Sequence, residues 1–301
     1  MKLGLHLPQS GPRTTVDAVL RVARAAEDSG YHSLWVFDHL IGPAKVASRY
    51  PGTADGAYDF DPSFPYLEAT ALLGAVAGAT TRIRLGTRVL VSILRPPVIL
   101  AKQLATVDAF AGGRLLLGVG TGWMKEEFDA VGVGMDRRLA RLDEHTELMQ
   151  RAWQQGVSSF AGDFYRHVEA GFHPQPPQPG NRIPVLLGGF RDAVLRRVAA
   201  YADGWAVYSP PTPGRDTHEL LPPAVLAERL DALRRFCDEA GRDFSELVIV
   251  TGGKLSSEPA DLAAHARLGV TVCDLVSFAP PDALIERATR LAETVGTEIT
   301  G

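Results

Sequence analysis

Short runs of β-branched and aromatic residues alternate with amphipathic helical stretches from one end of the 301-residue chain to the other. Strands that alternate with helices predict a parallel sheet joined by right-handed crossovers. We expect eight strands, at residues 3–7, 33–37, 83–90, 114–119, 184–187, 205–208, 247–251 and 271–278. The matching helices are expected at residues 16–29, 66–79, 96–110, 192–201, 224–240, 260–267 and 281–295. Eight such units in a chain of this length predict a (β/α)8 TIM barrel.

The alternation of strands and helices is interrupted once, after the fourth strand. Two helical segments, at residues 124–131 and 137–155, are followed there by a stretch rich in Gly, Pro and aromatic residues at 160–182. We therefore expect an insertion after strand 4. Because no composition break or flexible linker marks a boundary, residues 1–301 are expected to form a single domain. A doubly wound sheet is the alternative, but the glycine fingerprint that should follow its first strand is replaced by Gln-Ser-Gly-Pro at residues 9–12.

Charge and composition exclude several classes of protein. Lys plus Arg number 31 against 35 for Asp plus Glu, a net charge of −4, and no basic stripe typical of nucleic-acid binding is present. The apolar runs are too short for a membrane span, and the amino terminus lacks a signal-peptide layout. Cys237 and Cys273 stand far apart without CxxC spacing, which favours a reducing compartment. We expect a cytoplasmic protein with a small-molecule substrate and no metal, nucleic-acid or membrane partner.

In a (β/α)8 barrel the active site lies at the carboxyl ends of the strands. Side chains alternate along a strand, so Leu3, Leu5 and Leu7 are expected to face the outer helices and leave Gly4 and His6 inside the barrel. An inward histidine is either a core residue with satisfied hydrogen bonds or part of a substrate pocket.

The second strand ends in an acid and a histidine. Trp35 and Phe37 suit the helix layer, so we expect Val36 and Asp38 to point into the barrel. Histidine is a common proton-transfer residue near neutral pH. This makes His39, next to Asp38, a candidate catalytic residue.

Glycines dominate the end of the fourth strand. Gly118, Gly120 and Gly122 share one face, and if that face is the interior one it leaves a void that suits a flat ligand. A dinucleotide fingerprint fails here, because its third glycine would fall at Trp123. A methyltransferase loop is also disfavoured, because the acid expected before the first glycine is Leu116.

Two further strand ends carry candidate anion-binding groups. Gly188 and Gly189 follow the fifth strand and open a helix, where backbone N–H groups and the helix dipole form a phosphate cradle, with Arg191 adding charge. A simple tight turn is an equal alternative. Arg88 ends the third strand and needs an anionic partner inside the barrel, for which we expect Asp38 or a ligand phosphate.

Five segments, in this order and spacing, resemble the bacterial luciferase-like family of flavin and deazaflavin oxidoreductases. They are residues 34–39 (Leu-Trp-Val-Phe-Asp-His), 83–87, 114–123, 183–189 and 203–205. The resemblance covers nearly the whole chain, and it implies a (β/α)8 barrel with an insertion after the fourth strand and a homodimer. The family has two cofactor branches, one using reduced FMN with molecular oxygen and one using the deazaflavin coenzyme F420 for hydride transfer.

The Asp-His pair resembles the F420 branch. That resemblance implies that Asp38 hydrogen-bonds the ring system and that His39 assists proton transfer. A non-prolyl cis peptide supports the ring in this branch, and by position it would be Arg88-Val89.

The resemblance also assigns the cofactor's tail. The residues implied for the tail and its phosphate are Thr121, Gly122, Gly188 and Gly189, with Arg191 expected to add charge beside them. Those expected to line the substrate pocket are His6, Trp123 and Tyr208. Residues 40–65 and 211–223 are expected to set specificity.

This chain departs from the sugar-phosphate dehydrogenases of the F420 branch. They carry a catalytic glutamate where this chain has Trp123, and a phosphate-gripping basic residue where it has Ser209-Pro210-Pro211. We therefore expect an F420-dependent oxidoreductase acting on a small, uncharged organic substrate. The alternatives are an FMN-dependent monooxygenase that uses a separate reductase and O2, and a cofactor-binding relative without turnover.

Overall fold

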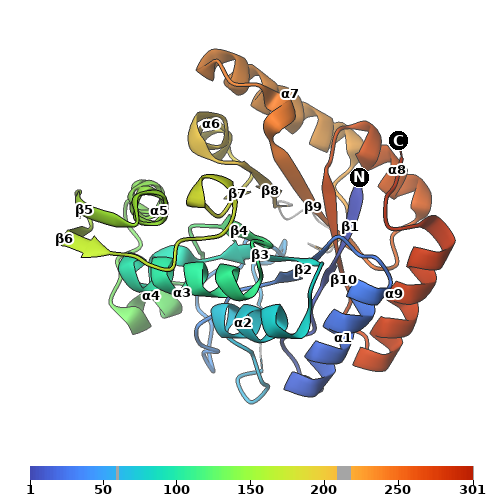
Figure 1. Cartoon of the computed structure of the whole chain (residues 1–301). Coiled ribbons are helices and arrows are strands. Elements are labelled where there is room, and N and C mark those ends of the chain that lie inside the picture. Colours follow the sequence, from blue (N-terminus) through green and yellow to red (C-terminus); the bar gives the residue numbers. More distant parts are fainter. Residues whose placement is uncertain (59–60, 209–217, 301) are drawn as a thin grey trace.

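Eight parallel strands close into a barrel in the computed structural model of the chain, which describes residues 1–58, 61–208 and 218–300 (Figure 1). The barrel strands are β1 (Lys2–His6), β2 (Ser33–Val36), β3 (Arg84–Leu90), β4 (Leu115–Val119), β7 (Val185–Gly189), β8 (Gly204–Val207), β9 (Val248–Lys254) and β10 (Val272–Val276). Their order around the barrel is β1-β10-β9-β8-β7-β4-β3-β2. The pairing of β1 with β10 brings the two ends of the chain together, where Met1 and Ile299 exchange two hydrogen bonds of 2.7 Å. The predicted (β/α)8 barrel is confirmed.

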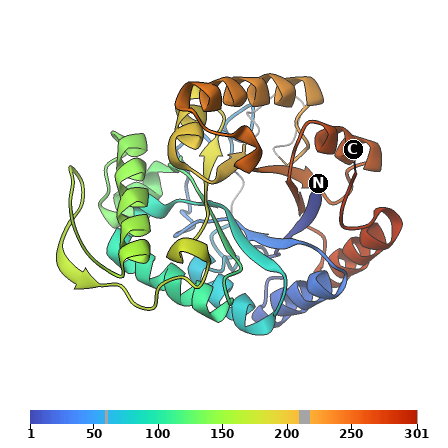
Figure 2. The ribbon, with the colours of Figure 1, turned by 45° about the horizontal axis from the view of Figure 1, so that its top comes forward.

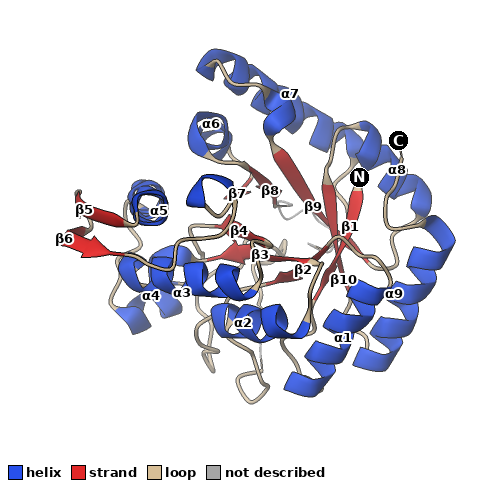
Figure 3. Cartoon of the chain, in the orientation of Figure 1, coloured by secondary structure: helices blue, strands red, loops and turns tan. Residues whose placement is uncertain are grey.

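Helices form a ring around the strands (Figures 2 and 3). They are α1 (Val16–Asp28), α2 (Ala69–Ala79), α3 (Pro97–Phe110), α6 (Asp192–Tyr201), α7 (Pro223–Ala240), α8 (Pro259–Arg267) and α9 (Pro281–Val295). Short 3-10 turns are present at η1 (Ser92–Leu94), η2 (Pro179–Asn181) and η3 (Phe244–Glu246). The predicted helices agree with these bounds to within a few residues. None of the helices in the described part of the chain combines the length and hydropathy that a membrane crossing requires.

The expected insertion after β4 is present. It consists of α4 (Lys125–Val131), α5 (Arg138–Gln155) and an antiparallel hairpin of β5 (Val157–Ala161) with β6 (Arg166–Gly171). Figure 2 shows the hairpin projecting away from the barrel beyond α5. The sequence predicts the two helices but not the hairpin, because its strands are short and mostly exposed, with buried side chains only at Ser158 and Phe160.

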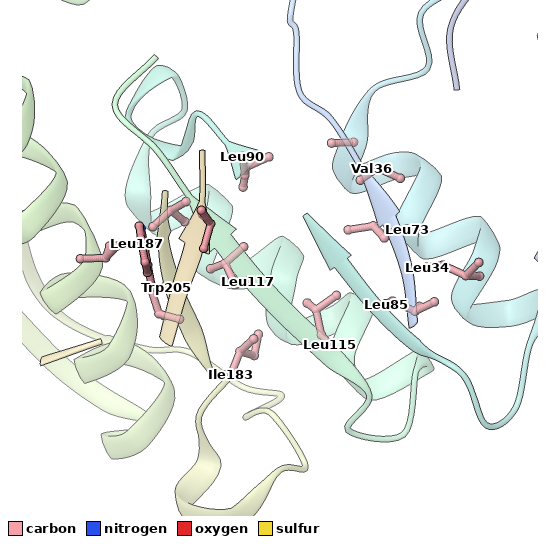
Figure 4. Close-up of a cluster of buried hydrophobic side chains, with 14 of the residues drawn as sticks. Leu34, Val36, Leu73, Leu85, Leu90, Leu115, Leu117, Ile183, Leu187 and Trp205 are labelled. Atoms are coloured by element: carbon pink, nitrogen blue, oxygen red, sulfur yellow. The ribbon is translucent and has the colours of Figure 1, made fainter. Parts of the chain in front are cut away.

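The barrel wall carries buried apolar side chains on both of its faces. The outer set packs against the helices, and Figure 4 shows Leu34 and Val36 of β2 in it, together with Leu73 of α2. The inner set fills the barrel and consists of Trp35, Leu116, Leu186, Ala206, Val250 and Val272. The orientation expected for β2 is therefore wrong: Trp35 points inward and Val36 points outward.

The interior holds the indole of Trp35 because small residues surround it. A Cβ on Gly86 would lie 2.4 Å from the Trp35 ring, and one on Gly4 would lie 2.5 Å from its Nε1. The indole N–H donates to Ser33 Oγ at 2.9 Å, so burial leaves this donor paired. Glycines in the two neighbouring strands thus make room for a bulky ring inside. The inward positions expected for Gly4 and His6 in β1 are confirmed.

Trp35→Ala is expected to lower the free energy of unfolding by about 3–5 kcal/mol, because it removes the largest interior side chain and leaves a cavity. Guanidinium unfolding followed by circular dichroism measures the change. Val168→Ala, at a β6 side chain that is 82% exposed, is the control and should change the value by less than about 0.5 kcal/mol. A loss below about 1 kcal/mol for Trp35→Ala would contradict the assigned interior.

Candidate active site

Aromatic rings gather around His39 at the carboxyl end of the barrel. The His39 ring centroid lies 5.3 Å from that of Tyr58, 5.5 Å from that of Tyr66 and 6.0 Å from that of Trp123. Tyr50 packs on Trp123, with 4.9 Å between the ring centroids. The loop after β2 and the segment after β4 therefore enclose the histidine together. Two of the predicted site residues, His39 and Trp123, meet here.

Tyr208, at the end of β8, lies beside this aromatic cluster. Burial raises the pKa of the Tyr208 phenol above its ordinary range, and the neighbouring Tyr50 raises it further. Burial likewise raises the pKa of Tyr66. The cluster thus offers neutral hydroxyl groups and apolar ring faces. Residues 209–217 lie outside the described residues, so the expectations for Ser209-Pro210-Pro211 and for that part of segment 211–223 are not addressed by the structure.

A buried carboxylate holds His39. Glu127, in the first turn of α4, is 2% exposed. Its Oε2 lies 3.2 Å from His39 Nδ1, and its Oε1 accepts the backbone N–H of Leu40 at 2.6 Å. Sequence reasoning misses Glu127, which lies 88 residues from His39. The available signal was an acid in the first turn of the helix that follows the glycine-rich end of β4.

The adjacent acid, Glu126, fastens the loop that covers the site. Its Oε1 accepts the backbone N–H groups of Ala47 at 2.6 Å and Ser48 at 3.1 Å, and its Oε2 accepts the Ser48 hydroxyl at 2.7 Å. Burial opposes ionisation, but these hydrogen bonds outweigh it and lower the pKa of Glu126 to about 2. Two consecutive glutamates therefore hold two points of the loop after β2, one at residues 39–40 and one at residues 47–48.

Asp38 is fully engaged by protein groups. Its carboxylate accepts two hydrogen bonds of 2.8 Å from the Arg95 guanidinium and one of 2.9 Å from the backbone N–H of Val91. Arg95 also donates to Glu68 at 2.6 Å. The expectation that Asp38 points into the barrel is wrong, because it bonds the segment that follows β3. Its hydrogen bond to a cofactor ring stays a prediction.

Arg88 of β3 crosses the inside of the barrel to Asp274 of β10. Its Nε donates to Asp274 Oδ2 at 3.0 Å, and a terminal nitrogen donates to the Val207 carbonyl at 3.1 Å. His6 Nδ1 lies 3.1 Å from the same carboxylate oxygen. Burial opposes ionisation of Asp274, but His6 and Arg88 hold its pKa below the usual value. Asp38 is therefore wrong as the expected partner of Arg88, because Asp274 on a strand distant in sequence supplies the carboxylate. A contact of Arg88 with a ligand phosphate stays a prediction.

His6 is a buried histidine with one engaged nitrogen. Its Nδ1 contacts Asp274, whereas its Nε2 has no hydrogen-bond partner in the described part of the chain. The His6 ring lies against Phe37, with 3.6 Å between centroids, so Phe37 faces inward rather than toward the helices as expected. The place of His6 in a substrate pocket stays a prediction. No group of three or more His, Cys, Asp or Glu side chains within the described residues is arranged to hold a metal ion.

The peptide bond between Arg88 and Val89 is cis, as the family resemblance implies. The Val89 side chain packs against glycines of the adjoining strands. A Cβ on Gly120 or Gly188 would lie 2.6 Å from a Val89 methyl carbon, and one on Gly118 would also meet this side chain. The glycine face of β4 is the interior one, which is the case in which a void is expected beside it. The void expected beside it is wrong, because Val89 fills that space.

The residues expected to hold the cofactor's tail lie at the ends of β4 and β7, which are neighbouring strands. Thr121 and Gly122 follow β4, and the Gly122 carbonyl accepts a hydrogen bond from Arg138 at 2.5 Å. Gly189 ends β7, and Arg191 is the N-cap residue of α6 without a side-chain capping bond. The backbone N–H of Val194 donates to the Arg191 carbonyl at 2.8 Å, which leaves the N–H groups of Asp192 and Ala193 as those without an intrahelical acceptor. The roles of these residues toward a cofactor stay predictions.

The closed parallel barrel, with His39 at its carboxyl end beneath the loop after β2, defines a (β/α)8 barrel whose candidate site lies where such folds carry their active sites. The chain belongs to the luciferase-like monooxygenase family, whose model matches residues 2–297. An uncharacterised protein of Mycobacterium tuberculosis is 37% identical over 222 residues, which cover 73% of this chain and 72% of that protein. An F420-dependent glucose-6-phosphate dehydrogenase of Nakamurella multipartita is 32% identical over 254 residues, covering 82% of this chain and 65% of the dehydrogenase.

Solved structures share the fold. The monooxygenase RslO1 from Streptomyces bottropensis has a TM-score of 0.74 at 21% identity, covering 97% of both chains. The F420-dependent tetrahydromethanopterin reductase from Methanopyrus kandleri has a TM-score of 0.71 at 16% identity, covering 96% of this chain and 97% of the reductase. The luciferase-like barrel expected from the sequence is thus confirmed.

Glu126→Gln is expected to loosen the loop over Trp123, because a neutral amide replaces the carboxylate that accepts three hydrogen bonds from Ala47 and Ser48. Acrylamide quenching of tryptophan fluorescence measures this opening, since the other three tryptophans have no exposed surface. At pH 7 the variant should be quenched more strongly than the wild type. Equal quenching of the wild type and Glu126→Gln would contradict a role of Glu126 in holding the loop.

The same attachment predicts a pH dependence. The pKa of Glu126 is about 2 in the folded protein, below its ordinary value of 4.5. The ionised Glu126 carboxylate therefore holds the loop fully above about pH 5, and this stabilisation of the closed loop is lost as the pH falls toward 2. Quenching of the wild type should rise over this range toward that of Glu126→Gln, with circular dichroism as the control for global unfolding.

Proposed function

We propose that the protein is an F420-dependent oxidoreductase that transfers a hydride between the deazaflavin coenzyme and a small, uncharged organic substrate. The observation that carries the proposal is His39, whose ring is fixed by Glu127 at the carboxyl end of the barrel and enclosed by aromatic side chains. The choice of F420 is supported by the Asp38-His39 pair and by 32% identity to two proteins named as F420-dependent glucose-6-phosphate dehydrogenases.

Two features at the carboxyl end of the barrel support a cofactor with a ring and a phosphate-bearing tail. The family resemblance assigns the ring to the segment at Arg88-Val89, and the chain that follows it is held by the hydrogen bonds that Val91 and Arg95 donate to Asp38. The uncapped start of α6 offers backbone N–H groups for a phosphate, next to the exposed Arg191.

Bound F420 supplies a hydride carrier at C5 of its ring. The chain supplies position, exclusion of water and a proton. Tyr50, Tyr58 and Trp123 cover His39 and shield the site from water. His39 Nε2 then exchanges a proton with a substrate oxygen. Because the covering side chains are neutral and largely apolar, the enclosure favours an uncharged substrate.

The purified protein is expected to bind oxidised F420 with a micromolar Kd and FMN at least about tenfold more weakly, a difference of about 1.4 kcal/mol. Quenching of intrinsic tryptophan fluorescence measures both affinities. Arg191→Ala should weaken F420 binding several-fold, because it removes a positive charge at the start of α6. Arg290→Ala is the matched control, since Arg290 lies on α9 and its side chain is 70% exposed.

The other possible outcomes of the cofactor titration each lead to a different conclusion about the function. Preference for FMN would replace the proposal with an FMN-dependent monooxygenase that needs a reductase and O2. Binding of F420 without its oxidation or reduction over a broad panel of alcohols and carbonyl compounds would indicate a cofactor-binding relative without turnover. Binding of neither cofactor would overturn the proposal.

We further propose that the chain forms a homodimer through the outward faces of α2 and α3, which lie side by side in Figure 1. α2 has no charged residue, and its outward positions include Ala71 and Ala75. On α3, Ile99 is 54% exposed and Phe110 is 70% exposed. Apolar surface of this kind marks protein interfaces.

Light scattering is expected to give twice the chain mass of 32.4 kDa. Ile99→Lys should shift the protein toward a monomer, because a buried interface tolerates an unpaired charge poorly. Val168→Lys, on the exposed hairpin, is the control. A monomeric wild type at micromolar concentration would contradict the proposed dimer.

A further inference from the structure

Glu127 makes two contacts that together constrain the ring of His39. One carboxylate oxygen accepts the backbone N–H of Leu40 at 2.6 Å, and the other lies 3.2 Å from His39 Nδ1. The Glu127 side chain is 3% exposed and that of His39 is 12% exposed. No other hydrogen bond of the His39 ring is present among the described residues, so its Nε2 is left for a molecule in the site.

An ionised carboxylate only accepts hydrogen bonds. For the contact with Glu127 to be a hydrogen bond, His39 Nδ1 must carry the proton. A neutral His39 then presents the lone pair of Nε2. The groups that face the ring on its other sides are the phenols of Tyr58 and Tyr66 and the indole of Trp123, none of which brings a charge.

We infer that Glu127 is a positioning residue that fixes His39 in the Nδ1–H tautomer, so that Nε2 exchanges a proton with a substrate hydroxyl or carbonyl oxygen. This inference rests on the proposed function for the identity of the reaction. When an alcohol is oxidised, its O–H and carbinol C–H bonds break and a C=O bond forms; the proton goes to His39 Nε2 and the hydride from the carbinol carbon goes to oxidised F420. Glu127 balances the charge of the resulting imidazolium; carbonyl reduction is the reverse.

The hydrogen bond from the Leu40 backbone N–H determines how the amide group of Glu127→Gln is oriented, which makes this variant a test of the His39 tautomer. A glutamine has one oxygen, and the short bond from Leu40 requires that oxygen. The amide NH2 group would then face His39 Nδ1, which must become an acceptor. The substitution should therefore move the ring proton to Nε2 and block proton acceptance there without removing the side chain.

Glu126→Gln is the matched control, because Glu126 is the neighbouring acid on α4, holds Ala47 and Ser48, and does not contact His39. Ring ¹⁵N chemical shifts report the tautomer, with the His39 signals assigned by their loss in His39→Gln. We expect the Nδ1–H form in the wild type and in Glu126→Gln, and the Nε2–H form in Glu127→Gln. A wild-type ring in the Nε2–H form, or a tautomer that Glu127→Gln leaves unchanged, would overturn the inference.

Kinetics provide the second readout. Replacing an orienting carboxylate by its amide leaves the wrong tautomer, so kcat in Glu127→Gln should fall on the order of 10²–10⁴-fold while KM changes little. Glu127→Asp, which is too short to reach both Leu40 and His39, should give mixed tautomers and an intermediate kcat, and it replaces Glu127→Gln if that variant fails to fold. Unchanged kcat with a switched tautomer would also overturn the inference. Failure of the proposed function is seen separately, as loss of F420 binding with the tautomer as predicted.

Discussion

The buried ion pair between Arg88 and Asp274 is the interaction on which the carboxyl end of the barrel depends. Asp274 has no exposed side-chain surface, and an unpaired carboxylate there would be strongly destabilising, so Arg88 must cross the interior to meet it. The guanidinium passes close to Gly252, where a Cβ would lie 2.1 Å from it. It also joins β3 to β10 and, through the Val207 carbonyl, to β8. The next residue, Val89, packs on glycines of β4 and β7, so one dipeptide organises much of the barrel end.

The first turn of α4 positions both His39 and the loop after β2. Glu126 and Glu127 are adjacent, yet one holds the covering loop and the other holds His39. Their different surroundings suit these tasks. Glu127 is buried and engages two groups, which fixes a ring, whereas Glu126 is half-buried and holds the backbone of the covering loop at Ala47 and Ser48. Closure over the site and orientation of the proposed proton-transfer residue are therefore set by consecutive residues of one short helix.

Much of the fold is predictable from the sequence, because the alternation of strands and helices repeats eight times. This local pattern indicates the barrel without knowledge of the tertiary contacts. The orientation of β2 cannot be predicted in this way. Whether Trp35 or Val36 faces the interior depends on glycines in the two neighbouring strands. The cis bond at Arg88 follows only from the family resemblance. Asp274 and Glu127 stay hidden for a different reason: each acts on a residue far away in sequence, and a lone acid carries no local signal of its partner.

We propose that His39, held by Glu127, faces F420 across the substrate. A crystal structure of the protein with oxidised F420 and a small alcohol or ketone tests this most directly. We expect one face of the deazaflavin ring to lie against the peptide at Arg88-Val89, and the substrate oxygen to lie within about 3 Å of His39 Nε2. A ring bound away from that peptide, or a substrate oxygen held by another group with His39 turned away, would contradict it.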